Sequence, residues 1–193
     1  MNITRNEMKF VLTIFKSIEI EYNANSISKI LNITPMGALK IAKNLEKQEI
    51  ISYKELGKAK FFKLNLENEY VKQYIKFLLQ KESKEGTPFL RAKINDIITI
   101  KNADAAILFG SALTKNKEAN DIDILLITDQ KRFPKVKKEI ESLNLINPKK
   151  YHPIYQTKDD IKGNIKDGDK VIFNAIKGIV AFGEDLIIKL LSK

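Results

Sequence analysis

The chain of 193 residues has no cysteine and only one histidine. Without cysteine it can form neither a disulfide nor a zinc site built from thiolates. Long apolar runs are also missing, and the opening MNITRNEMKF lacks the apolar centre of a signal peptide. No internal repeat or low-complexity tract interrupts the sequence. We therefore expect a cytoplasmic protein with no membrane partner.

Negative charge is scarce relative to positive charge. The chain has 34 Lys and Arg against 24 Asp and Glu, which gives a formal net charge of +10. This balance favours polyanionic partners such as nucleic acid or nucleotide phosphates, although a solvated lysine-rich surface gives the same count. The length fits one ordinary domain or two small ones with cores of their own.

The first part of the chain shows three helical patterns followed by two strand patterns. Apolar residues at helical spacing cover 4–18, Asn25-Ser26 is a candidate cap for a second helix, and Thr34-Pro35 begins a third. The runs 50–53 and 59–64 then predict a β-hairpin. This order resembles the winged helix-turn-helix module, in which the third helix enters the major groove of DNA.

The resemblance implies contacts with duplex DNA from the outer face of the third helix and from the lysine-rich hairpin tip. The alternative is an ordinary solvated helix surface. The residues expected to contact DNA are Met36, Lys40, Lys43, Asn44, Lys47, Lys58 and Lys60.

Residues 68–81 form an apolar helix whose apolar face is wider than a surface helix needs. Such a face packs on the winged module, on a second domain, or on a second copy of the chain in a homodimer. The sequence SKEGTP at 83–88 is the best candidate for a linker. We therefore expect a winged helix-turn-helix domain at 1–85 and a second domain at 86–193.

The second domain is organised around residues 105–128. A buried strand is predicted at Ala105–Phe109, Gly110-Ser111 breaks it, and a second strand begins at Asp121. Asp121 and Asp123 are two residues apart, so a strand places both carboxylates on one face. Because two such charges repel each other unless a cation lies between them, the pattern predicts a magnesium site.

Gly110 allows close approach of the backbone to a ligand, and Ser111 would begin a short helix whose N–H groups favour a phosphate. With Asp121 and Asp123, this resembles DNA polymerase β-type nucleotidyltransferases, most closely their minimal branch. The resemblance covers about the C-terminal half of the chain. It implies an α+β fold, with a small mixed sheet flanked by helices after the winged helix-turn-helix domain.

The resemblance also implies functional roles. Asp121 and Asp123 would hold Mg²⁺, or Mn²⁺ in its place, against a nucleoside triphosphate. Gly110 and Ser111 would contact its outer phosphates, and Lys115 would meet phosphate as a point charge. An acceptor hydroxyl would attack the α-phosphorus and release pyrophosphate. The acceptor could be a protein side chain, since related minimal nucleotidyltransferases adenylylate partner toxins.

The chain departs from the family pattern in three respects. Its spacer at 112–120 is one residue shorter than usual, and Thr114-Lys115 replaces the common Arg-Gly. The third carboxylate is missing, and His152 lies about where it would be, as a base, a weak ligand or a structural residue before a proline. Asp159 and Asp160 fit the cap of a following helix better than a metal site.

The remaining patterns predict helices at 89–98, 134–143, 167–177 and 186–191 and strands at 151–157 and 180–182. Three functions stay open. The first is a nucleotidyltransferase tethered to a DNA-binding module. The second is a DNA-binding transcriptional regulator with a catalytically weak, nucleotide-sensing domain. The third is a structural or antitoxin role through protein contacts.

Overall fold

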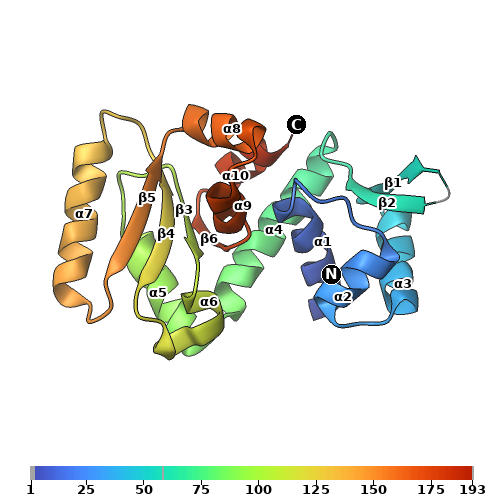
Figure 1. Cartoon of the computed structure of the whole chain (residues 1–193), viewed down its shortest axis with the longest axis horizontal. Coiled ribbons are helices and arrows are strands. Elements are labelled where there is room, and N and C mark those ends of the chain that lie inside the picture. The colour runs from blue at the N-terminus through green and yellow to red at the C-terminus, as the bar shows by residue number, and fades with distance from the viewer. Residues whose placement is uncertain (1–2, 58, 193) are drawn as a thin grey trace. The chain divides into compact units, whose positions relative to one another are not determined.

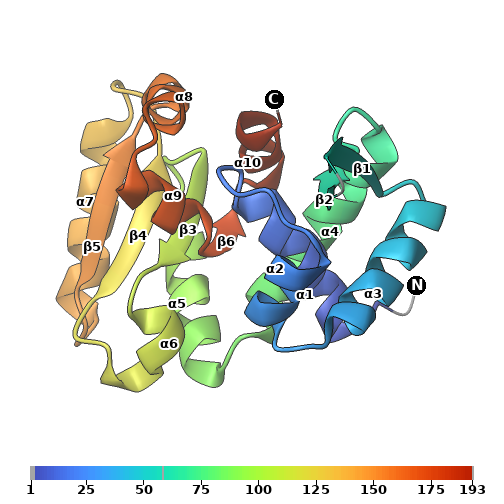
Figure 2. The same ribbon diagram turned by 45° about the vertical axis from the view of Figure 1, so that its right-hand side comes forward.

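A computed structural model describes residues 3–57 and 59–192 and shows an α+β chain with two small sheets (Figures 1 and 2). It divides into two compact units, Met1–Leu78 and Leu79–Lys193. This division lies inside helix α4, Glu69–Glu85, whereas the sequence places the domain boundary after residue 85. In the described part of the chain, no helix is both long and apolar enough to cross a bilayer.

The first unit has the predicted order of three helices followed by a two-stranded hairpin. Its elements before α4 are α1 Arg5–Lys16, α2 Ala24–Leu31, α3 Pro35–Lys47, β1 Ile51–Leu56 and β2 Ala59–Leu64. The two strands pair antiparallel across the turn at Gly57. This arrangement has the element order of a winged helix.

Local sequence explains where α2 and α3 begin. The Thr34 side chain accepts a hydrogen bond from the backbone N–H of Gly37, and Pro35 occupies the first helical turn, as predicted. The predicted start of α2 at Asn25-Ser26 is wrong. Asn23 caps this helix, because its side-chain oxygen reaches two backbone N–H groups while Ser26 bonds back in a capping box.

A compact apolar core holds this unit together. On α3 the inner residues Ala38, Ala42 and Leu45 are fully buried. The Phe10 ring of α1 lies 5.0 Å from the Phe62 ring of β2, which ties the first helix to the hairpin. Burying the inner face of α3 leaves its opposite face toward solvent.

The predicted linker at 83–88 is wrong for half its length, because 83–85 continue α4. Only Gly86 and Thr87 separate α4 from α5, Pro88–Ile98. The Thr87 hydroxyl caps α5 by accepting a hydrogen bond from the Leu90 N–H, and a proline follows Thr87. Polar residues such as 83–85 are compatible with a helix, so their composition alone placed the start of the linker too early.

The second unit has a four-stranded sheet with helices on both sides. After α5 its elements are β3 Ala105–Phe109, α6 Ala112–Lys115, the 3-10 turn η1 Asn116–Glu118, β4 Ile122–Ile127, α7 Phe133–Ile146, β5 Tyr151–Gln156, α8 Lys158–Asp167, α9 Lys170–Ile176, β6 Ile179–Phe182 and α10 Glu184–Leu191. The strand order is β5-β4-β3-β6. The β4 and β5 strands run parallel and the other two described pairs antiparallel, so the sheet is mixed.

The helix predicted at 167–177 is in fact the end of one helix and all of another. Gly168, at φ 75°, ends α8 in the left-handed region, and Asp169 caps α9. Thr157 is the cap of α8, and the Asp160 carboxylate completes the capping box by accepting from the Thr157 N–H. Asp160 therefore serves a helix start, as the sequence suggests.

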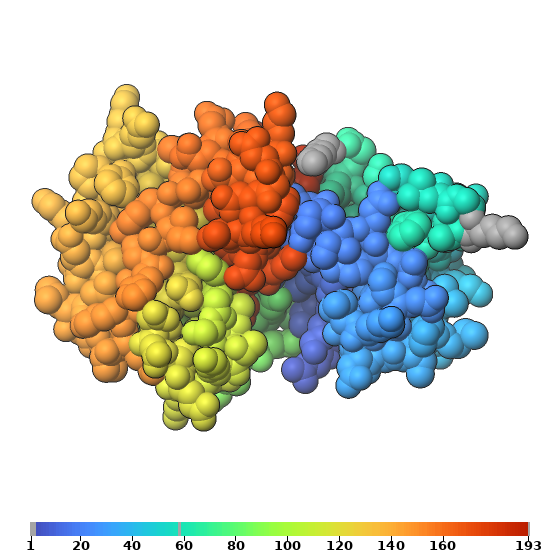
Figure 3. Space-filling model, in the orientation of Figure 1, coloured from blue at the N-terminus to red at the C-terminus, as the bar shows by residue number. Residues whose placement is uncertain are grey.

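Alternation along β4 gives the sheet two different faces. Ile122, Ile124 and Leu126 point into an apolar core shared with α5 and α7. Asp121 and Asp123 therefore point to the opposite face, on which α9 packs against β3 (Figure 1). In the space-filling view the turn after β3 and the following α6 and η1 (yellow-green) lie at the surface (Figure 3).

Candidate functional site

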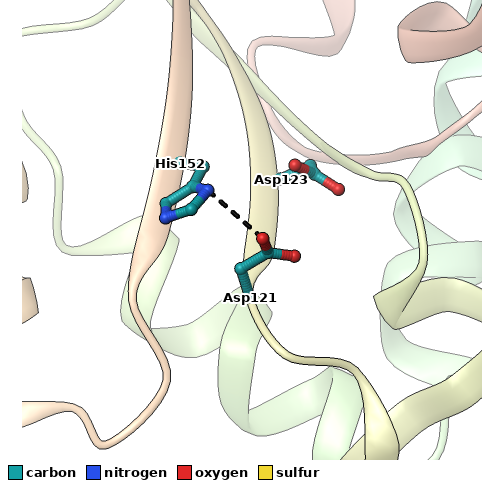
Figure 4. Close-up of side chains that lie close together, drawn as sticks. All are labelled: Asp121, Asp123 and His152. Atoms are coloured by element: carbon teal, nitrogen blue, oxygen red, sulfur yellow. Dashed lines mark ion pairs between the residues drawn. The ribbon is translucent and has the colours of Figure 1, made fainter.

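Strand register brings three polar side chains together at one end of this sheet. The parallel pairing of β4 with β5 sets Asp123 opposite His152, and Asp121 lies just before β4 (Figure 4). His152 Nδ1 is 3.3 Å from Asp121 Oδ2. One ligand atom from each of the three residues lies within 4.8 Å of the others. All three side chains remain partly exposed, so ions and small molecules can reach them.

Gly110 is fitted against the second carboxylate of this cluster. Its φ is +77°, in the region that side chains disfavour, and a Cβ added there would lie 2.0 Å from Asp123 Oδ2. The backbone of the next residue, Ser111, hydrogen-bonds to the same carboxylate. The Gly-Ser turn therefore holds Asp123 in place, and only glycine fits at its first position.

Electrostatics in the cluster are unfavourable for two ionised carboxylates. Burial raises the pKa of the Asp123 carboxyl above its usual range, and the charge of Asp121 adds to this effect. His152 and the Ser111 backbone act in the opposite direction without cancelling it. A divalent cation between the carboxylates would relieve their repulsion. The donor atoms, two carboxylates and one imidazole, fit such an ion chemically.

The predicted phosphate-contacting residues lie beside this cluster along the chain. Helix α6 is a single turn of four residues, and the Ser111 side chain forms no capping bond to it. The Ser111 backbone is already bonded to Asp123, which differs from the expectation of N–H groups open to a phosphate. Lys115, at the end of α6, is exposed and forms no ion pair with the described residues.

Tyr151, the residue directly before His152, is buried in the core under α5 and α7 and contacts three polar side chains there. The Asn144 side chain accepts from the Tyr151 N–H at 2.7 Å and donates to its carbonyl at 3.1 Å. The Tyr151 hydroxyl donates to Asp96 at 2.6 Å, and the Lys93 ammonium lies 5.4 Å from the centre of its ring. Burial and Asp96 both raise the pKa of Tyr151, so it stays neutral. These contacts fix the start of β5, and with it the position of His152.

The first unit offers a separate polar surface on α3. Met36, Lys40, Lys43, Asn44 and Lys47 are all exposed, as the winged-helix expectation requires. None of these three lysines forms an ion pair with any residue in the ranges that the structure describes.

A groove of about 810 Å³ runs along this face of α3, with the first turn of α1 on its other side. Glu7 lines the groove, and its carboxylate accepts a hydrogen bond from the Asn44 side chain at 3.3 Å. The groove therefore has a lysine-rich wall with one acidic group facing it.

Of the hairpin lysines expected to contact DNA, Lys60 already has partners within the protein. Lys60 pairs with Glu55 across the hairpin at 3.1 Å, and its ammonium lies 5.7 Å from the centre of the Tyr53 ring. Lys58, at the hairpin tip, lies outside the described residues. The lysines of α3 therefore remain the main candidates for contacts with an anion.

Comparison with known proteins gives little beyond this geometry. No protein-family model matches the chain, and no curated protein matches it. Two solved structures of Lactococcus lactis ZitR, one of a single mutant and one of a double mutant, are similar over 51% of this chain and 73% of theirs. Both are 16% identical to it, with TM-scores of 0.32 and 0.33. Likeness at this level does not establish a shared function.

Sequence reasoning missed the residues that support the cluster from outside it. Lys93, Asp96 and Asn144 are spread over two helices, and none belongs to a local motif. Glu7, on the wall of the α3 groove, reads in the sequence as an ordinary residue in the first turn of a helix. Only the folded chain shows that Lys93, Asp96 and Asn144 contact Tyr151, the residue before His152, and that Glu7 lines the groove of α3.

Proposed function

We propose that this protein is a DNA-binding regulator whose second unit binds a nucleoside triphosphate together with a divalent cation. The observation that carries the DNA-binding part is the outer face of α3, where three exposed lysines follow one another at helical spacing. In a winged helix this element lies in the major groove. Its lysines would then contact phosphates, and Met36 and Asn44 would lie near base edges.

The nucleotide-binding part rests on the cluster of Asp121, Asp123 and His152 beside the Gly110 turn. A cation held there would neutralise negative charge on the phosphates of a bound nucleotide. Lys115, at the end of the single-turn helix α6 that follows Ser111, offers an exposed positive charge to phosphate. These residues together favour a nucleoside triphosphate over an uncharged small molecule.

The DNA-binding part is tested by reversing charge on α3. A variant with Lys40→Glu, Lys43→Glu and Lys47→Glu should bind duplex DNA more weakly, with a salt dependence reduced by about one unit of slope for each lost phosphate contact. Fluorescence anisotropy with labelled duplex at several salt concentrations measures both quantities. A variant with Lys135→Glu, Lys137→Glu and Lys138→Glu, three exposed lysines of α7, is the control for the same change of net charge.

If the α3 variant binds DNA as the parent does, at every salt concentration, α3 is not the DNA-contacting helix. If the parent itself retains no duplex DNA at low salt, the regulator proposal fails altogether. Circular dichroism of the α3 variant checks the fold, which these substitutions should preserve because the three side chains are exposed.

The nucleotide-binding part is tested with ATP and a divalent cation. Asp121→Asn and Asp123→Asn should each abolish cation-dependent ATP binding in isothermal titration calorimetry, because each removes a charged ligand from the cluster. Asp159→Asn is the matched control, since this carboxylate is 93% exposed and its ion pair, with Lys162, is long at 3.6 Å. Unchanged ATP binding in both cluster variants would overturn the site.

Nucleotidyl transfer is a second candidate function, favoured by the shared strand face of Asp121 and Asp123 beside the Gly110 turn. An acceptor hydroxyl, on a protein side chain for example, would form the new bond to the α-phosphorus while pyrophosphate leaves. Labelled ATP incubated with the protein, with and without cell lysate, shows whether label is transferred. Loss of transfer in His152→Ala, at cation and ATP concentrations that still saturate the variant, would make His152 the proton acceptor.

A further inference from the structure

The cation cluster has an unusual set of donor atoms for a magnesium site. His152 is the only histidine in the chain, and it lies in the sheet directly opposite Asp123. Its Nδ1 atom faces Asp121 Oδ2 at 3.3 Å, so the imidazole points into the cluster although its side chain is 60% exposed (Figure 4). This orientation gives the cluster one nitrogen donor beside its two carboxylates, with one ligand atom of each residue within 4.8 Å of the others.

Mg²⁺ strongly prefers oxygen ligands and near-ideal octahedral geometry. Imidazole nitrogen instead suits the divalent ions of the first transition row, whose affinities for mixed nitrogen and oxygen sites rise from Mn²⁺ toward Cu²⁺. A third carboxylate in place of His152 would add charge and an oxygen donor and would favour Mg²⁺. A neutral imidazole at that position gives the site one negative charge fewer than a carboxylate would, and it supplies a nitrogen donor.

We infer that this site selects a first-row transition ion over Mg²⁺, bound through His152 Nδ1 and one carboxylate oxygen each from Asp121 and Asp123. The inference rests on the proposed cation–nucleotide site and names its ion. Ligands about 2.0–2.2 Å from a common ion lie no more than about 4.4 Å apart. The three donors already lie within 4.8 Å of one another, so a small inward movement of side chains completes the site.

Two of these donors are held in place by contacts outside the cluster. Gly110 and the Ser111 backbone fix Asp123 from one side. Asn144 clamps the backbone of Tyr151, the residue directly before His152, on the neighbouring strand. Such supporting contacts orient ligands and strengthen metal binding. The cluster therefore has the support expected of a site that distinguishes between ions.

The test measures the ratio of Co²⁺ affinity to Mg²⁺ affinity, by calorimetry on the full chain in metal-free buffer. Co²⁺ serves as the transition-ion probe because imidazole ligation also changes its visible absorption. The ratio should fall at least about tenfold in His152→Ala, since even supporting residues of metal sites contribute this much to affinity. In His152→Asp it should fall further, through tighter Mg²⁺ binding. Asp159→Asn should leave the ratio unchanged.

A ratio that is the same in the parent, His152→Ala and His152→Asp would overturn the inference while leaving a cation site of carboxylates in place. If Asp121→Asn binds both ions as the parent does, or if the parent binds neither, the proposed cation–nucleotide function fails as well. Because His152 is exposed, its variants should fold normally, and circular dichroism checks this.

Discussion

At the scale of single residues, the cation cluster depends on a position that carries no functional group. Gly110 adopts φ +77°, and its missing side chain leaves the space that the Asp123 carboxylate occupies. The geometry of the proposed cation site is therefore set partly by the side chain that Gly110 lacks. The carboxylate fits closely against the turn and accepts a hydrogen bond from its Ser111 backbone.

Gly110→Ala should destabilise the protein and weaken cation binding together. The left-handed backbone alone costs about 1–2 kcal/mol for a residue with a Cβ, and the Cβ would displace Asp123 from the cluster. Urea denaturation and Mn²⁺ titration measure the two effects. Gly163→Ala, in α8 with open space around it, should instead stabilise the helix by up to about 1 kcal/mol. Full cation affinity in Gly110→Ala would show that the space beside Gly110 does not position the Asp123 carboxylate.

At the scale of elements, the site depends on how the first residues of β5 are fixed against β4. His152 meets Asp121 only because Tyr151 pairs with Ile122 and His152 with Asp123. A shift by one residue would turn the imidazole to the opposite face. Because β5 lies at the edge of the sheet, Tyr151 has no further strand to pair with on that side, and the Asn144 side chain of α7 bonds its backbone N–H and carbonyl instead.

Asn144→Ala should loosen β5 and reduce cation affinity without touching a ligand. It leaves the Tyr151 N–H and carbonyl without their side-chain partner, at a cost of about 1–3 kcal/mol in the free energy of unfolding. The matched control is Ser142→Ala on the same helix, where the hydroxyl bonds to the Lys138 carbonyl within the helix. Equal cation affinity in both variants would show that the Asn144 contact does not position His152.

At the scale of the whole molecule, the proposed function requires that the two units affect each other. Helix α4 contains the point at which they divide, so one continuous helix belongs to both. Thermodynamic linkage demands that, if bound nucleotide changes DNA affinity, DNA changes nucleotide affinity by the same factor. A regulator differs in this respect from an enzyme that is only tethered to DNA.

ATP with a divalent cation should therefore change the affinity of the full chain for duplex DNA, by about 5-fold or more if the coupling has a typical size. The direction of the change would show whether nucleotide favours the bound or the free state. Anisotropy titrations with and without saturating ATP and Mn²⁺ measure it, and Asp121→Asn should remove the effect. An unchanged DNA affinity, with nucleotide binding verified in the same sample, would mean that the units act independently.

Local sequence determined where several helices and turns begin and which strand residues share a face. Thr34-Pro35 began α3, alternation along β4 separated the aspartates from the isoleucines, and Gly110 followed the buried strand β3 as predicted. These features depend on neighbours a few residues apart, through capping, side-chain alternation and the freedom of glycine. The start of α2 was misjudged because two nearby asparagines can each cap a helix, and the end of α4 because the polar residues 83–85 fit a linker as well as a helix. The break at Gly168 was missed because apolar helical spacing continues across it.

Tertiary structure alone decided which distant residues meet. The sequence placed His152 only roughly on a neighbouring strand, and the parallel register of β4 and β5 set its Nδ1 beside Asp121. Asn144 contacts Tyr151 because α7 packs beside β5, and Glu7 contacts Asn44 because α1 packs beside α3. Such contacts depend on the packing of whole elements, in which each side chain's partner is chosen by register and by the buried core, and no local pattern records that choice.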